Sequence, residues 1–193
     1  EIRSSDWSSD VCSSDLAEYR AVIEWIRELP LSDAIEVGDR AYLLVHAGIE
    51  PRAFTCWLAG AGYTGEDGYV DVPIDALRQA MAAQDEEDLL WIREAFWGVP
   101  TGLVGPDGRG PVVIAGHTPS SLLFRYAANM CGTGCNKDGL GCMVEVGPTH
   151  DTGGVADHLA IDCSAAAGAG VGRVGVMRLD DRCVWYGDIA EGE

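Results

Sequence analysis

The sequence VVIAGHTP, at residues 112–119, runs from four apolar residues directly into a turn that contains a glycine, a histidine and a proline. An unbroken apolar run of this length is typical of a strand buried on both faces, as in sheets that are covered by helices. A second run of this kind, YLLV at 42–45, ends in a similar way, in HAG at 46–48. Together with helices early in the chain and an antiparallel hairpin late in it, these short buried strands predict an α/β fold with a mixed sheet packed against helices.

Each run places a histidine, His46 or His117, at the C-terminal end of the predicted strand. Ligands of open α/β sheets usually bind at this edge. The small residues beside each histidine leave the imidazole uncovered, and a neutral imidazole is a good ligand for a divalent metal. One such histidine alone would more often cap its strand by hydrogen bonding. The repetition of the pattern favours a metal site that contains both.

Arg93 stands within the apolar run LLWIREAF at 89–96. A charged side chain in such a run is costly to bury without an anionic partner. Because guanidinium binds phosphate oxygens in a bidentate manner, Arg93 is a candidate phosphate-binding residue. A structural salt bridge, or a surface pair with Glu94, accounts for the pattern equally well, and the residues alone leave both interpretations open.

The rest of the chain fits the same fold class. Periodicity and turn residues predict helices at 17–29, 74–83 and 86–96, strands at 34–37, 41–46, 112–115 and 159–162, and a hairpin of 173–179 with 182–186. Glycine-rich composition predicts loops at 48–73 and 98–111, and a long surface insertion at about 122–157.

The composition limits the partners. The 193 residues include 13 basic and 31 acidic side chains, which give a formal net charge of −18. Such a surface repels nucleic acids, so no nucleic-acid partner is expected. Because there is neither a long apolar run nor a recognisable secretory signal, we expect no membrane partner and a cytoplasmic location. The seven cysteines are then expected to be free thiols.

Residues 1–16 (EIRSSDWSSDVCSSDL) contain the triplet Ser-Ser-Asp three times. Natural low-complexity linkers can look like this, but DWSSDVCSSDL at 6–16 also resembles a translated sequencing-library adapter. We therefore treat residues 1–16 as non-native and assign residues 17–189 to the domain. This interpretation leads us to expect that an N-terminal part of the natural protein is missing.

Four blocks of the chain occur in the order seen in bacterial calcineurin-like metallophosphoesterases: HAGIEP (46–51), LLWIRE (89–94), AGHTP (115–119) and IDCSAAAGAGVGRVGVMRLDDRCVWY (161–186). HAG and GHT are weak signals singly, but four blocks in order resemble the family over nearly all of 17–186. The resemblance implies part of a four-layer αββα sandwich. The family's first metal motifs (GDxHG, GDxxDRG and GNHE) do not occur here, so its N-terminal metal-binding strands would be missing.

The resemblance also implies a function, which is hydrolysis of phosphoric esters at a site of two divalent metal ions (Mn, Fe or Zn). By their place in the motifs, His46 and His117 would ligate one metal, and Arg93 would bind the phosphate of a phosphoprotein or nucleotide substrate. Two metals clamp the phosphoryl oxygens and activate a bound water. Because the other ligands and the general-acid histidine belong to the missing motifs, we expect this chain alone to be inactive, and we assign no catalytic residue in it.

Three alternative interpretations stay open. Relatives that act as bis(5'-nucleosyl)-tetraphosphatases share the HAG and GHT blocks, and the chain could also be a non-catalytic fragment. A small zinc module could form from cysteines and a histidine in or near the insertion, although their spacing lacks the paired C-x2-C pattern. Its candidate ligands are Cys131, Cys135 and Cys142 with His150 or His158.

The last block departs from the family pattern, because Cys163 and Ser164 stand where Thr-Gly is usual. Access to the pocket is therefore expected to differ from that of the family. Asp157 and Asp162 are additional acidic groups near the motifs, and the sequence assigns no role to either.

Overall fold

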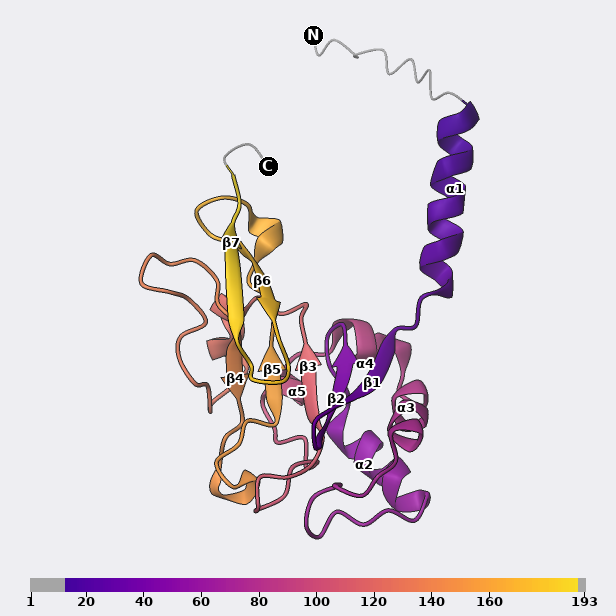
Figure 1. Ribbon diagram of the computed structural model, residues 1–193, viewed down its shortest axis with the longest axis vertical. Coiled ribbons are helices and arrows are strands. Elements are labelled where there is room, and N and C mark those ends of the chain that lie inside the picture. Colours follow the sequence, from indigo (N-terminus) through magenta and orange to yellow (C-terminus); the bar gives the residue numbers. More distant parts are fainter. Residues whose placement is uncertain (1–12, 191–193) are drawn as a thin grey trace. The chain divides into compact units, whose positions relative to one another are not determined.

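The computed structural model describes residues 13–190, which form two separate units (Figure 1). The described part of the first unit is mainly one helix, α1 (Ser13–Glu28), which begins four residues before the predicted start at Ala17. The helix is amphipathic, and the large apolar side chains of Tyr19, Val22 and Trp25 are exposed on it.

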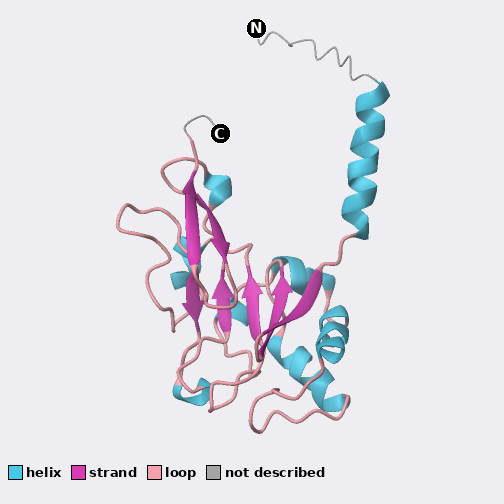
Figure 2. Cartoon of the chain, in the orientation of Figure 1, coloured by secondary structure: helices cyan, strands magenta, loops and turns pink. Residues whose placement is uncertain are grey.

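The second unit, which begins at Leu31, is built on a five-stranded mixed sheet (Figure 2). The strand order is β1-β2-β3-β5-β4. The three central strands run parallel, and the two edge strands are antiparallel to their neighbours. The strands are β1 (Ser32–Val37), β2 (Arg40–Val45), β3 (Val112–Ala115), β4 (Val144–Val146) and β5 (His158–Ala160). The predicted α/β class with a mixed sheet is therefore confirmed.

Both faces of the central strands are buried, as their unbroken apolar runs predict. Leu43 and Val113 lie opposite each other in the register of β2 and β3 and belong to the larger core cluster. Their neighbours along the strands, Tyr42 and Val112, belong to a second cluster on the other face. All four residues of β3 are buried.

Four α-helices accompany the sheet: α2 (Pro51–Gly60), α3 (Ile74–Ala82), α4 (Glu86–Trp91) and α5 (Glu94–Trp97). The predicted loop at 48–73 is wrong over residues 51–60. There the Glu50 side chain caps α2 by accepting hydrogen bonds from the main-chain N–H groups of Arg52 and Ala53, and Pro51 occupies the first turn. The helix predicted at 86–96 is interrupted between α4 and α5, because Ile92 adopts an extended conformation (φ −57°, ψ 142°).

The segment 122–157 contributes to the sheet as well as to the surface. It contains β4, whose Val144 and Val146 side chains are buried in the larger core cluster. The remaining short elements are the 3₁₀ helices η1 (Ser120–Arg125), η2 (His150–Thr152) and η3 (Ala165–Ala167).

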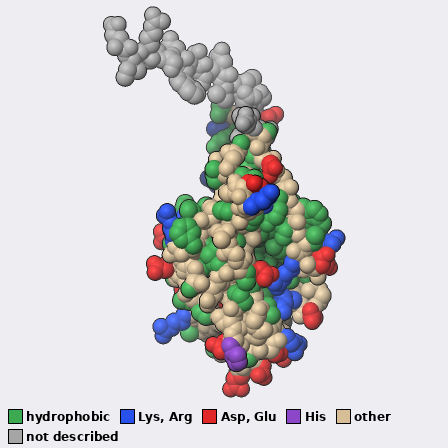
Figure 3. All heavy atoms as spheres, turned by 90° about the vertical axis from the view of Figure 1, so that its left-hand side faces the viewer, with side chains coloured by type: hydrophobic (Ala, Val, Ile, Leu, Met, Phe, Trp, Pro, Cys, Tyr) green, Lys and Arg blue, Asp and Glu red, His purple; other side chains and the backbone are tan. Residues whose placement is uncertain are grey.

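The predicted late hairpin is present as a separate two-stranded sheet of β6 (Arg173–Met177) and β7 (Val184–Asp188). On one of its faces Val174, Val176 and Trp185 are exposed. Figure 3 shows hydrophobic side chains on the surface among acidic and basic ones. Among residues 13–190, no helix is long and apolar enough to span a membrane.

Candidate metal centre

The candidate site lies where three neighbouring parallel strands end. His46 follows β2 directly, His117 follows β3 after Gly116, and Asp162 follows β5 after Ile161. Main-chain hydrogen bonds extend the ladder to this edge, since Gly116 N–H donates to the His46 carbonyl at 2.8 Å. The edge therefore gathers side chains that are far apart in the sequence.

The two predicted metal ligands meet here. His46 Nε2 lies 3.1 Å from His117 Nδ1, although the residues are 71 positions apart. The ring centroids are 4.9 Å apart and the ring planes are inclined by 58°, so the two nitrogens face each other without stacking. His46 is exposed and His117 is half-buried, which leaves the pair open to solvent on one side.

A strained turn presents His117. Its φ angle is 60°, in the left-handed region that non-glycine residues rarely occupy. Thr118 N–H donates to the Gly116 carbonyl at 2.6 Å, which closes a three-residue turn centred on the histidine. Such conformations cost about 1–3 kcal/mol and are concentrated at functional sites. The turn is therefore a second feature, independent of the ring distance, that points to a role for His117.

The turn after β2 is held against the helical segment that precedes α5. Ala47 N–H donates to the Leu89 carbonyl at 2.9 Å. At Gly48, an added Cβ atom would lie 2.5 Å or less from two ring atoms of Phe96. The Trp91 ring stands edge-on to His117, with 5.1 Å between the ring centroids. The small residues beside His46 are thus required by close packing, which fixes the position of the imidazole.

The surroundings of His117 favour its neutral form. Burial lowers the pKa of His117 below its usual value, and the positive charge of Arg93 and the neighbouring His46 lower it further, while Asp162 opposes this shift. Since only a neutral imidazole can donate a lone pair to a metal, the shift suits a ligand. The Nε2 atom of His117 is buried and has no hydrogen-bond partner among the described residues, which is uncommon for a buried polar atom.

Arg93 lies close enough to His117 for its charge to act on that pKa. It occupies the break between α4 and α5, with φ −135° and ψ −84°, and its side chain is half-buried. Among residues 13–190, no carboxylate forms a salt bridge with Arg93, so the pair with Glu94 that the sequence left open is not formed. The guanidinium is therefore available beside the histidine pair.

Asp157 and Asp162, to which the sequence assigns no role, lie at opposite edges of the sheet, because one precedes β5 and the other follows it. Asp162 is half-buried at the same edge as the histidines, and its Oδ1 atom accepts a hydrogen bond from Ser164 N–H at 2.8 Å. Ser164 also has a positive φ, 64°. Asp157 precedes β5 at the opposite edge, where it is fully buried and bonded to Thr101 and His158. The strand order, which the sequence does not reveal, decides this difference.

The alternative zinc module is not assembled in this structure. In the part of the chain that is described, no three or more His, Cys, Asp or Glu side chains are grouped to hold a metal, so the cysteines do not form such a group and the histidine pair does not form one with Asp162. Of the two candidate histidines, His158 is buried against Asp157 and the Phe96 carbonyl, whereas His150 is exposed on η2. The six described cysteines, which include Cys131, Cys135 and Cys142, form no disulfide with one another.

The geometry of the histidine pair fits a shared cation. Two nitrogen ligands about 2.1 Å from one metal lie about 3.0–3.4 Å apart when the angle between them is about 90–109°. The observed 3.1 Å lies within this range. It also equals the length of an ordinary hydrogen bond between a protonated and an unprotonated ring nitrogen, so the pair can hold a proton in place of a metal.

In comparisons with known proteins, no family model, no curated protein and no solved structure matches the chain.

Proposed function

We propose that the chain carries half of a dinuclear metal centre in a calcineurin-like phosphoesterase that hydrolyses phosphoric esters. The observation that supports this most directly is the 3.1 Å approach of His46 Nε2 to His117 Nδ1. In this proposal the five-stranded sheet belongs to a four-layer αββα sandwich. The further ligands of two divalent ions (Mn, Fe or Zn) come from a part of the protein outside these residues.

The roles of the residues follow from their positions. His46 and His117 hold one cation through their facing nitrogens, and the strained turn and the packing at Gly48 keep the two rings in place. Arg93 binds oxygens of the phosphoryl group and offsets their charge, because it lies beside His117 without a carboxylate partner among the described residues. When bound, the metals supply Lewis-acid activation of the phosphoryl group and of water.

The acidic surface makes Arg93 important in this proposal. A protein with a formal net charge of −18 repels a phosphorylated substrate at long range. The substrate, a phosphoprotein or a nucleotide, must therefore be attracted locally by metals and arginine. Removal of the Arg93 charge is expected to weaken substrate binding far more than removal of an exposed arginine elsewhere.

Metal binding is tested by adding Mn²⁺ to the 193-residue chain and following the paramagnetic broadening of histidine ring signals by NMR. We expect the signals of His46 and His117 to broaden at lower Mn²⁺ than those of His150, which is exposed beside Asp151 and reports non-specific attraction to the acidic surface. His46→Ala should abolish the preferential broadening at His117. Equal broadening at all three histidines would contradict the proposal.

Catalysis is tested with p-nitrophenyl phosphate and Mn²⁺. We expect little or no turnover by the 193-residue chain and clear turnover by the full-length parent protein. In the parent protein, Arg93→Ala should raise KM, whereas Arg125→Ala, at an exposed position on η1, should leave it unchanged. Strong metal-dependent turnover by the chain alone would show that its own residues complete the site.

A further inference from the structure

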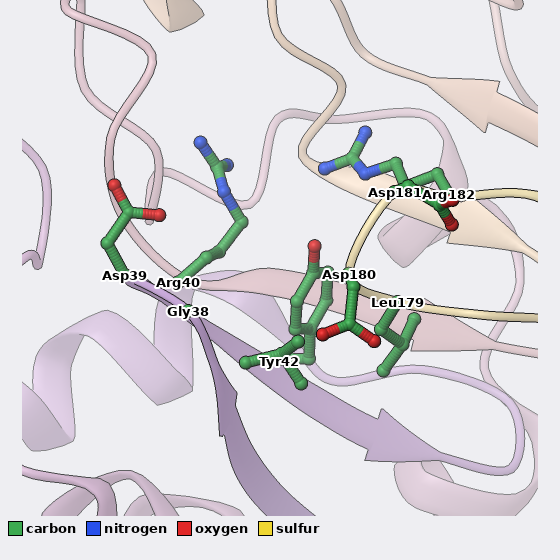
Figure 4. A pocket seen from close by; sticks show the side chains of 9 residues that line it. Gly38, Asp39, Arg40, Tyr42, Leu179, Asp180, Asp181 and Arg182 are labelled. Carbon is green, nitrogen blue, oxygen red and sulfur yellow. The ribbon is translucent and has the colours of Figure 1, made fainter.

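A cavity of about 380 Å³ lies at the end of the sheet opposite to the histidine pair. It is formed by the turn between β1 and β2 and by the turn between β6 and β7 (Figure 4). Strand β2 begins at Arg40 beside this cavity and ends at Val45 next to His46, so the length of the strand separates the two places. The cavity is therefore distinct from the candidate metal centre.

Three hydrogen-bond donors line this cavity: the guanidinium groups of Arg40 and Arg182 and the hydroxyl group of Tyr42. Figure 4 shows the three polar ends directed toward the same side of the cavity. The Tyr42 side chain is only 4% exposed, so packing holds its ring in one position. Its hydroxyl group lies next to the Arg182 guanidinium. Rigid donors that converge in this way are typical of sites for oxyanions.

Arg40 is only partly satisfied. Its Nη2 atom donates to the Gly108 carbonyl at 2.8 Å, but its Nη1 atom is buried and has no hydrogen-bond partner in the part of the chain that is described. No carboxylate among residues 13–190 forms a salt bridge with it, although Asp39 is adjacent in the sequence. Arg40 therefore lines the cavity without a carboxylate ion pair among the described residues.

Arg182 is held in place by an ion pair with Glu145. Its Nη1 atom donates to Glu145 Oε1 at 2.7 Å, and its backbone has a φ of 55°, in the left-handed region. A glycine or asparagine would be the usual choice for this turn position. From this strained position, the Arg182 guanidinium points toward β2 across the cavity.

The acidic side chains limit the ligand. Asp181 is paired with Arg178, which holds the pKa of Asp181 at about 2, while Asp39 and Asp180 also line the cavity. A highly charged polyanion would be repelled by these carboxylates. A single phosphate group on the three donors is compatible with them, and the carboxylates can accept hydrogen bonds from hydroxyl or amino groups of the same ligand.

We propose that this cavity binds a small phosphorylated ligand, with its phosphate group on Arg40, Tyr42 and Arg182. The volume of about 380 Å³ leaves room for a ligand larger than phosphate itself. The site does not depend on the function proposed above, because it shares no residue with the metal centre.

The probe is inorganic phosphate, added to the metal-free chain at low ionic strength in the presence of a chelator. Binding is followed through the ¹H–¹⁵N side-chain signals of the arginines by NMR. We expect saturable shifts at Arg40 and Arg182. Arg40→Gln should weaken the affinity by about tenfold, which corresponds to about 1.4 kcal/mol, because it removes a charged hydrogen-bond donor.

Two controls separate this site from the metal centre and from the general surface. Arg93→Gln and Arg125→Gln should leave the affinity that is read from the Arg40 and Arg182 signals unchanged, whereas a shift of the Arg93 signal itself would report phosphate at the metal centre. Tyr42→Phe, which removes only a hydroxyl group, should weaken binding even if Arg40→Gln disturbs the fold. The proposal is overturned if phosphate shifts neither Arg40 nor Arg182, or if the affinity read from these two signals is unchanged by Tyr42→Phe or falls with Arg93→Gln.

Discussion

Gly48 lies against the Phe96 ring so tightly that a Cβ atom at Gly48 would be within 2.5 Å of two ring atoms. The Ile92 side chain approaches the same point at 2.8 Å. This contact joins the turn that carries His46 to the segment that carries Arg93. The relative position of the two candidate site residues therefore depends on the absence of a side chain at residue 48.

Gly48→Ala is expected to destabilise the protein by about 1–3 kcal/mol, the usual cost of overpacking a filled interior. The measurement is the free energy of unfolding in urea. Gly60→Ala is the matched control, because nothing lies within 4 Å of an added Cβ at that last residue of α2. We expect the control to be neutral or slightly stabilising. Equal effects of the two substitutions would show that the interior around Gly48 can relax to accept a methyl group.

In two places, an aspartate and a histidine that are neighbours in the sequence form a pair, and the two pairs differ in burial. Loss of the aspartate should therefore change the free energy of unfolding differently in the two cases. His158 Nδ1 faces Asp157 Oδ1 at 2.6 Å and His158 Nε2 faces the Phe96 carbonyl at 3.2 Å, with both side chains about 1% exposed. Both ring nitrogens of His158 therefore have a hydrogen-bond partner inside the protein, and Asp157 Oδ2 also accepts from the Thr101 N–H at 2.7 Å. Asp157→Ala should cost about 1–3 kcal/mol, because it leaves buried hydrogen-bonding groups of His158 and Thr101 without their partner.

The comparison is with Asp151→Ala, whose partner His150 lies at 3.8 Å in a fully exposed pair. We expect no measurable change in the free energy of unfolding from this substitution, since exposed pairs contribute little. If both substitutions are silent, the Asp157–His158 contact does not stabilise the fold.

Cys163 should resist alkylation at pH 8. Burial raises the pKa of the Cys163 thiol to about 11, and the nearby Cys142 contributes to this increase. A raised pKa favours the protonated thiol, so at pH 8 only about one thousandth of Cys163 is the reactive thiolate. The exposed Cys56 is the internal reference. Peptide mass spectrometry after brief iodoacetamide treatment should find Cys56 modified and Cys163 intact. Modification of both at similar rates would show that Cys163 is accessible.

The elements of this fold that can be predicted are those whose conformation is determined by a pattern in their own few residues. The buried strands β2 and β3 are predictable because an unbroken apolar run of four residues between turns strongly favours a buried strand, and the two histidines follow from the ends of these strands. Helix α2 escapes prediction because its glycine-rich surroundings favour a loop. The signal that could have found it is Glu50-Pro51, a capping residue followed by proline at the first position.

Further features depend on pairing that the sequence does not show. Asp162 joins the histidines only because β5 lies next to β3, and a different strand order would have moved it away. The segment predicted as an insertion supplies the edge strand β4 for the same reason, since its short Val-Glu-Val run becomes a strand only beside β5. The break at Arg93 interrupts an otherwise continuous helical pattern, at the point where the Ile92 side chain packs near Gly48.

The strained turn at His117 leads to a prediction that separates backbone from side chain. Both His117→Gly and His117→Ala remove the imidazole, but only glycine adopts a φ of 60° without cost. We therefore expect the metal-free His117→Gly variant to be more stable to urea than His117→Ala by about 1 kcal/mol. In an ordinary helix the order is the reverse, because glycine there is less stable than alanine by about 1 kcal/mol. Both variants should lose the preferential Mn²⁺ effect at His46. An alanine variant as stable as the glycine variant would mean that the turn relaxes once the ring is gone, and that the imidazole itself imposes the strain.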